Sequence, residues 1–181
     1  MLDGSREALT VSDWGRSVYG NPCRECGYKW SINVPDAIQL IRLIPERYAA
    51  LIGDGDGSRH GAGLEWSSGA YVCHVTDNLR IWAERLVGVT RGSDWPIAQY
   101  DSDLLACARN YESVAVAGAL WSLRDSVDRW AYAVAAAETH GVVLSHPVRG
   151  PQSVSDVVRN NAHDAHHHAW DIERIEASTS D

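Results

Sequence analysis

The stretch NNAHDAHHHAWD, residues 160–171, holds four of the eight histidines of the chain. Residues four apart lie on one face of an α-helix, so His163 and His167 are expected to present their imidazoles together. His166 lies on one flank of that face and His168 toward the far side. A histidine pair at this spacing is a weak metal site by itself, and a solvated helix face is the alternative. A third ligand from another helix would favour a metal site.

The candidate for that third ligand is His74, in the middle of a second predicted helix. The alternative for a lone helical histidine is a core residue hydrogen-bonded to a carbonyl oxygen. With His163 and His167 it would give three neutral imidazoles from two helices, which leaves a coordination position open, as in catalytic sites. Zinc is the first metal to expect, and nickel, iron and cobalt are alternatives, because imidazole binds them all. Three acidic residues could orient a ligand histidine or simply lie on a solvated surface: Asp77, Asp164 and Asp171.

Cys23 and Cys26 form a C-x-x-C-G motif, which supplies half of many zinc sites. No second C-x-x-C motif completes it. Three interpretations remain open: a second metal site completed by a histidine such as His60 or His140, a structural turn with two thiols, or a redox-active pair. A redox pair is disfavoured because no thioredoxin-like βαβ pattern accompanies the motif.

The elements that must position these residues are helices, because apolar residues recur at steps of three and four. Pro45 falls inside the first of these patterns and predicts a kink or a frayed turn. A possible capping box, Ser153–Asp156, precedes the last pattern, and Ser67 or Ser68 can cap the second. We predict an all-α four-helix bundle over residues 34–176 behind an irregular, cysteine-containing leader over residues 1–33. The predicted helices span residues 35–52, 67–89, 112–138 and 154–176, with a short helix over 104–109.

Length and charge narrow the function classes. A chain of 181 residues suits one compact domain. Its net charge of -8 disfavours nucleic acid, because phosphate binding needs a concentrated basic surface. No apolar run is long enough to span a membrane and no signal peptide is evident, so we expect no membrane partner and a cytoplasmic location. A homodimer is compatible with the sequence.

Trp66, Ser67, His74 and Asp77, followed about ninety residues later by His163, His166 and His167, resemble the motifs of the DinB/YfiT-like superfamily of four-helix bundles. This superfamily includes bacillithiol and mycothiol S-transferases and the mycothiol-dependent maleylpyruvate isomerase. The resemblance covers about residues 34–176. It implies metal ligands at His74, His163 and His167, with His166 and Asp77 as catalytic neighbours. The leader with Cys23 and Cys26 departs from the family pattern.

A metal with an open position can lower the pKa of a bound thiol or activate water. The resemblance favours the thiol and implies a transferase that adds a low-molecular-weight thiol, of the mycothiol type, to an electrophilic small molecule. A thiol-dependent isomerase and a metal-dependent hydrolase are alternatives at the same site. A third alternative is a metal-binding or stress-related protein without turnover.

Overall fold

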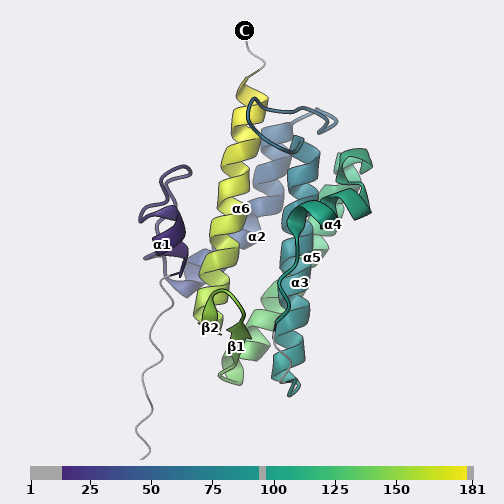
Figure 1. Ribbon diagram of the computed structural model, residues 1–181. Coiled ribbons are helices and arrows are strands. Elements are labelled where there is room, and N and C mark those ends of the chain that lie inside the picture. The colour runs from purple at the N-terminus through teal and green to yellow at the C-terminus, as the bar shows by residue number, and fades with distance from the viewer. Residues whose placement is uncertain (1–13, 94–96, 179–181) are drawn as a thin grey trace, which may run out of the picture.

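The computed structural model describes residues 14–93 and 97–178. Four long helices form the body of the molecule, and shorter elements lie beside them (Figure 1). The elements follow one another as α1 (Trp14–Tyr19), α2 (Val34–Ile52), α3 (Ser68–Thr90), α4 (Ser102–Arg109), the 3₁₀ turn η1 (Tyr111–Ser113), α5 (Val116–Thr139), β1 (Val143–His146), β2 (Gly150–Ser153) and α6 (Val154–Ala177).

The four long helices pack as a ring in the order α2, α6, α3, α5. The predicted four-helix bundle is therefore confirmed, although α5 begins four residues later than expected because η1 precedes it. α3 and α6 are neighbours in this ring (Figure 1). The ring thus brings together residues about ninety positions apart in the chain.

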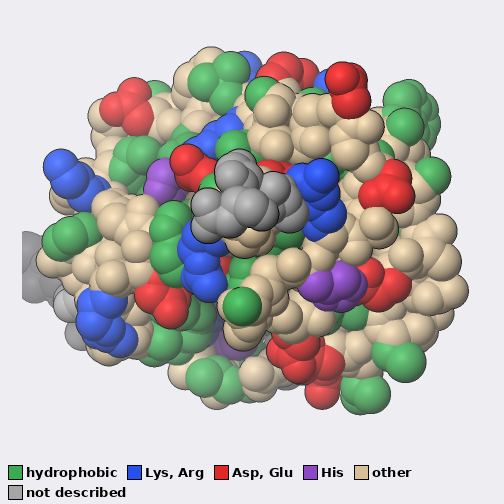
Figure 2. Space-filling model, turned by 90° about the horizontal axis from the view of Figure 1, so that it is seen from above, with side chains coloured by type: hydrophobic (Ala, Val, Ile, Leu, Met, Phe, Trp, Pro, Cys, Tyr) green, Lys and Arg blue, Asp and Glu red, His purple; other side chains and the backbone are tan. Residues whose placement is uncertain are grey.

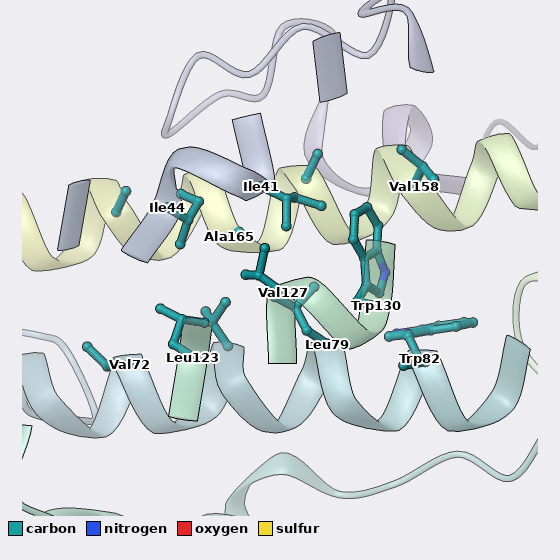
Figure 3. Close-up of a cluster of buried hydrophobic side chains, with 14 of the residues drawn as sticks. Ile41, Ile44, Val72, Leu79, Trp82, Leu123, Val127, Trp130, Val158 and Ala165 are labelled. Atoms are coloured by element: carbon teal, nitrogen blue, oxygen red, sulfur yellow. The ribbon is translucent and has the colours of Figure 1, made fainter. Parts of the chain in front are cut away.

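The core fills the space between the four helices with aliphatic side chains and two indoles (Figure 3). Leu79 from α3 and Leu123 from α5 are completely buried. Trp130 is also fully buried, and its indole N–H donates a hydrogen bond of 3.0 Å to Asn161 Oδ1 on α6, which satisfies its only polar atom. The stripe of α6 that faces away from the histidines is thereby held against α5.

Both helices that carry the histidines begin with a side-chain cap. Ser67 accepts a hydrogen bond from the Ala70 backbone N–H and begins α3. Ser153 and Asp156 exchange hydrogen bonds in the predicted capping box and begin α6. These caps fix the first turn of each helix and therefore the direction in which its histidines project.

Three expectations need correction. A two-stranded antiparallel hairpin, with Val143 opposite Ser153, interrupts the all-α architecture; its four-residue strands are too short to give an alternating pattern. Within the described part of the leader, Trp14–Tyr19 is helical rather than irregular. The first long helix runs without interruption from Val34 to Ile52, with Pro45 buried inside it.

The surface carries mixed charge. On the face seen in Figure 2, acidic and basic side chains are interspersed rather than collected into one patch. Among the described residues, no helix combines the length and apolar character that crossing a membrane requires.

Candidate metal centre

Helix α6 carries two interleaved pairs of potential ligands. His163 and His167 are one turn apart, and Asp164 and His168 repeat that spacing one residue later. A step of one residue turns the helix by about 100°, so the two pairs face different neighbours. The structure gathers each pair into a separate group of side chains.

The first group consists of His74, Asp164 and His168. One potential ligand atom from each lies within 4.8 Å of the others. Asp164 Oδ1 is 3.6 Å from His74 Nε2 and 3.7 Å from His168 Nε2. Both separations are close to the roughly 3.3–3.6 Å between nitrogen and oxygen atoms bound to one tetrahedral zinc ion.

His168 is held in a defined orientation by Asp171. The distance from His168 Nδ1 to Asp171 Oδ2 is 2.9 Å, and Asp171 is buried. A carboxylate at this position accepts the Nδ1 proton, so that the lone pair of His168 is on Nε2, the nitrogen nearer to Asp164. Carboxylate-to-imidazole contacts of this kind orient histidine ligands in metalloproteins.

Asp164 is ionised. Partial burial opposes the charged form, but the neighbouring His74 and His168 and a hydrogen bond of 2.6 Å from Asn78 Nδ2 lower the pKa of its carboxyl well below the usual range. Tyr100 in turn donates a hydrogen bond of 3.3 Å to Asn78 Oδ1, which fixes the amide. The group therefore combines one carboxylate with two imidazoles.

A cavity of about 200 Å³ adjoins this group, with His74 and Asp164 in its wall. Two arginines also line it. The guanidinium carbon of Arg149 lies 4.0 Å from the centroid of the Trp14 ring, and that of Arg85 lies 4.7 Å from the centroid of the Trp82 ring. In the described part of the chain neither guanidinium has a carboxylate within ion-pair distance, so the cavity carries positive charge opposite Asp164.

The second group contains Cys23 and Cys26 from the leader and His163 and His167 from α6. One atom from each lies within 4.8 Å of the other three. Burial, aided by the neighbouring His167, lowers the pKa of His163 to about 4, so its imidazole is neutral at pH 7. Burial raises the pKa of the Cys26 thiol to about 12.

The structure thus divides the predicted trio of His74, His163 and His167. The face of α6 that carries Asp164 and His168 is turned toward α3, so His74 of α3 joins these two residues. The face that carries His163 and His167 is covered by the leader instead. The signal for the observed trio was present in the sequence, because Asp164 and His168 also have i, i+4 spacing. A histidine pattern does not reveal this trio, because its third ligand is a carboxylate.

His166 belongs to neither group, contrary to the role expected for it. Its Nδ1 accepts a hydrogen bond of 3.2 Å from Arg47, and its Nε2 lies 3.2 Å from the carbonyl oxygen of Cys26. The accepted bond leaves the proton on Nε2, which donates to that carbonyl. His166 therefore anchors the leader to α6.

Asp77 also lies outside both groups. Its carboxylate is buried and accepts hydrogen bonds of 2.7 Å from Arg109 and 2.6 Å from the Tyr111 hydroxyl. It lies three residues after His74, so the helix has turned by about 300°, roughly 60° short of a full turn, and its side chain meets α4 and η1. The structure thus places its contacts with α4 and η1, and the role expected for it at the metal site stays a prediction.

The two histidines considered as partners of Cys23 and Cys26 lie elsewhere. His60 Nε2 is 3.4 Å from a carboxylate oxygen of Glu112. His140 is exposed, and its Nδ1 is 2.7 Å from the Ala136 carbonyl oxygen at the end of α5. The histidines that lie near the two cysteines are instead His163 and His167 of α6, which were predicted to act with His74.

Comparison with known proteins agrees with this fold. No curated protein matches the chain. Among solved structures, YfiT from Bacillus subtilis, described as a probable metal-dependent hydrolase with an unusual four-helix bundle topology, matches with a TM-score of 0.69 and 16% identity. The match covers 80% of this chain and 86% of YfiT. The family model of the DinB superfamily matches residues 9–172, and the chain belongs to that superfamily.

Proposed function

We propose that this protein is a metal-dependent hydrolase that binds a divalent transition metal at His74, Asp164 and His168 and acts on a small anionic substrate. The convergence of two imidazoles and one carboxylate at the wall of a cavity carries the proposal. YfiT, which shares the fold, is described in the same terms, and this likeness gives secondary support.

The three side chains suit a catalytic metal. Two histidines and a carboxylate form the ligand set of several zinc hydrolases, in which a further coordination position stays open. Zinc is the first metal to test. Iron is the strongest alternative, because two histidines and one carboxylate also bind non-haem Fe(II), and nickel and cobalt accept the same donors. A divalent metal held there supplies a Lewis acid and an activated water.

The residues around the group have separable tasks. Asp171 fixes the tautomer of His168, and Asn78 holds the Asp164 carboxylate in place. Arg85 and Arg149 face the cavity and bind the anionic part of the substrate. A volume of about 200 Å³ is below the range usual for drug-sized ligands, which indicates a small substrate.

Thiol transfer is the second candidate function. It is favoured by the family motifs at Trp66, Ser67 and His74, which resemble those of thiol S-transferases. An open metal position accepts a thiol as readily as water and promotes its ionisation. A mycothiol-type thiol would then be the cosubstrate and the anionic molecule the electrophile.

The experiment compares turnover with and without thiol. Protein loaded with zinc, iron, nickel or cobalt is assayed against small carboxylate-bearing esters and amides, and against carboxylate-bearing electrophiles with a mycothiol-type thiol. Turnover without thiol supports the hydrolase, and turnover that requires thiol supports the transferase. His74→Ala and His168→Ala should lose the metal bound at this group together with the activity, whereas His140→Ala, an exposed histidine outside both groups, should retain both. Full activity in the His74 variant would refute the site, and stoichiometric metal without turnover on any substrate would indicate a metal-binding protein instead.

A further inference from the structure

The leader and α6 enclose a second group of ligands that the proposed function does not use. Cys23, Cys26, His163 and His167 each contribute one atom to a cluster in which all separations are at most 4.8 Å. A tetrahedral zinc ion with Zn–N and Zn–S bonds of about 2.0–2.3 Å holds its ligand atoms about 3.3–3.8 Å apart. Small side-chain movements would therefore bring the four atoms to coordination distance.

Two ring nitrogens in this group are buried without a hydrogen-bond partner. His163 Nε2 and His167 Nδ1 are two of the three side-chain atoms of that kind in the described part of the chain. His163 is only 5% exposed. A buried nitrogen without a partner is costly, and two of them in a group that also holds two thiols suit the coordination of a metal ion.

The backbone around the cysteines has the form of a metal-binding knuckle. The Cys23 N–H donates a hydrogen bond of 2.8 Å to the Tyr28 carbonyl, and the Gly27 N–H donates one of 3.0 Å to the Cys23 carbonyl. Gly27 adopts φ +72, which a side chain would disfavour, so the glycine that follows Cys26 allows the chain to turn back. This turn directs both thiols toward α6.

The knuckle is also anchored on either side. The Tyr28 hydroxyl donates to the Arg159 carbonyl at 3.1 Å, and the Arg159 side chain donates to the Ile32 carbonyl at 3.0 Å. The rings of Tyr19 and Trp30 pack on His163, with centroids 4.5 and 4.7 Å from the imidazole. Outside the group, His167 Nε2 lies 3.5 Å from Glu25 Oε2, a contact that orients its other nitrogen.

We propose that Cys23, Cys26, His163 and His167 bind one zinc ion as a closed structural site that fixes residues 14–33 to α6. Two thiolates and two imidazoles fill a tetrahedral shell and leave no position for substrate. Binding displaces the two thiol protons into solvent. The site is distinct from the group of His74, Asp164 and His168, although each α6 ligand of one group is the direct neighbour of a ligand of the other.

This placement gives the zinc a role in shaping the cavity. Trp14 and Tyr19, both from the fixed segment, line the cavity that contains His74 and Asp164. Figure 1 shows α1 beside α6. Removal of the structural zinc would release the segment that carries Trp14 and Tyr19 from α6, without removing any ligand of the catalytic metal.

The first test is metal content, measured by elemental mass spectrometry on untagged protein saturated with zinc and then desalted. Cys23→Ser with Cys26→Ser should lose one equivalent relative to the wild type. The matched control, Cys73→Ser with Cys107→Ser, should keep the full complement. His74→Ala with His168→Ala should lose the other equivalent and keep this one, so failure of the catalytic site is distinguished from failure of the structural site. A folded Cys23, Cys26 variant with wild-type zinc content would overturn the proposal.

The second test does not depend on the cysteine variant folding. Zinc X-ray absorption on the His74→Ala, His168→Ala variant should show two sulfur atoms at about 2.3 Å and two nitrogen atoms at about 2.0–2.1 Å. A shell of nitrogen and oxygen alone, or no zinc in this variant, would overturn the site. Chelation should also speed trypsin cleavage after Arg24 or Lys29 at least tenfold; an unchanged rate after complete zinc removal would overturn the structural role.

Discussion

Asp164 and His168 lie one turn apart on α6, with Asp164 Oδ1 3.7 Å from His168 Nε2, and together they face His74 across the seam with α3. One residue earlier on the same helix, the corresponding pair of histidines faces the leader. Two adjacent stripes of one helix therefore serve two groups of ligands. A carboxylate in one stripe and thiols opposite the other give the two groups different chemistry.

The carboxylate of Asp164 is central to the first group, and Asp164→Asn tests its charge. The amide keeps the shape of the side chain and can still accept the hydrogen bond from Asn78. We expect metal affinity at this site to fall at least about 100-fold, because a charged ligand becomes a neutral one. Competition with a chromophoric chelator measures this affinity. Asp103→Asn, an exposed aspartate in α4, is the control, and equal affinity in the two variants would contradict the assignment.

Asp77 provides a contrasting case, because its contacts are structural. Asp77→Ala leaves the buried Tyr111 hydroxyl without its acceptor, and we expect the free energy of unfolding to fall by about 1–3 kcal/mol. Loss of the ion pair with Arg109 adds little to this decrease, because the Arg109 side chain is 46% exposed and its charge can be solvated by water. Metal content should not change.

Urea denaturation measures the stability of the Asp77 variant, and elemental analysis measures its metal. The matched control is Asp125→Ala, which breaks an exposed i, i+4 ion pair with Arg129 and should change stability by less than about 0.5 kcal/mol. A folded Asp77 variant that loses metal would restore the role first expected for this residue.

The sequence predicted the helices well because their signals are local. Apolar periodicity, the Ser67 cap and the Ser153–Asp156 box each lie within a few residues of the element they define. The partners of each ligand depend instead on helix rotation and on which segment covers α6. A shift of one residue, from His163 to Asp164, turns the side chain by about 100° and changes its neighbour, and motif spacing alone did not resolve that shift.

The partners of the leader cysteines could likewise not be predicted from local sequence. The C-x-x-C-G motif marked Cys23 and Cys26 as half of a metal site, but nothing local in the chain indicates that residues 163 and 167 lie opposite them. Contacts such as that between His166 and the Cys26 carbonyl join segments 140 residues apart. The β1–β2 hairpin was not part of the predicted all-α fold for another reason, because four-residue strands carry almost no periodic signal.

Stability should depend on pH through His146. This histidine is buried beside Trp82, and its Nδ1 accepts hydrogen bonds from the backbone N–H groups of Val148 and Arg149. Burial, together with the charges of Arg149 and Arg85, lowers its pKa from 6.5 to about 4. The unfolded chain therefore binds a proton that the folded chain does not between these pH values, and stability falls as pH decreases from about 6.5 toward 4.

His146→Asn removes this titration while its side-chain oxygen can accept the same backbone hydrogen bonds. Chemical denaturation at several pH values between 4 and 7 should show a shallower loss of stability in the variant than in the wild type. His140→Ala, which changes an exposed histidine, should follow the wild-type profile. Identical slopes for the wild type and the His146 variant would show that His146 is protonated in the folded state across this range.

Arg149 offers a test of the substrate class. Its guanidinium stacks on Trp14 and faces the cavity, where it is expected to bind an anionic group of the substrate. A hydrogen bond to a charged group contributes about 1.5–3 kcal/mol, so Arg149→Ala should raise KM for an anionic substrate about 10-fold to 100-fold and change kcat little. For a neutral analogue of the same substrate, Arg149→Ala should raise KM much less. Arg149→Lys, which keeps the positive charge, should recover part of the affinity for the anionic substrate. Arg129→Ala, which removes a largely exposed arginine, is the control. An equal increase in KM for the anionic and the neutral substrate would show that Arg149 supports the cavity wall through its packing on Trp14 and does not bind the anionic group of the substrate.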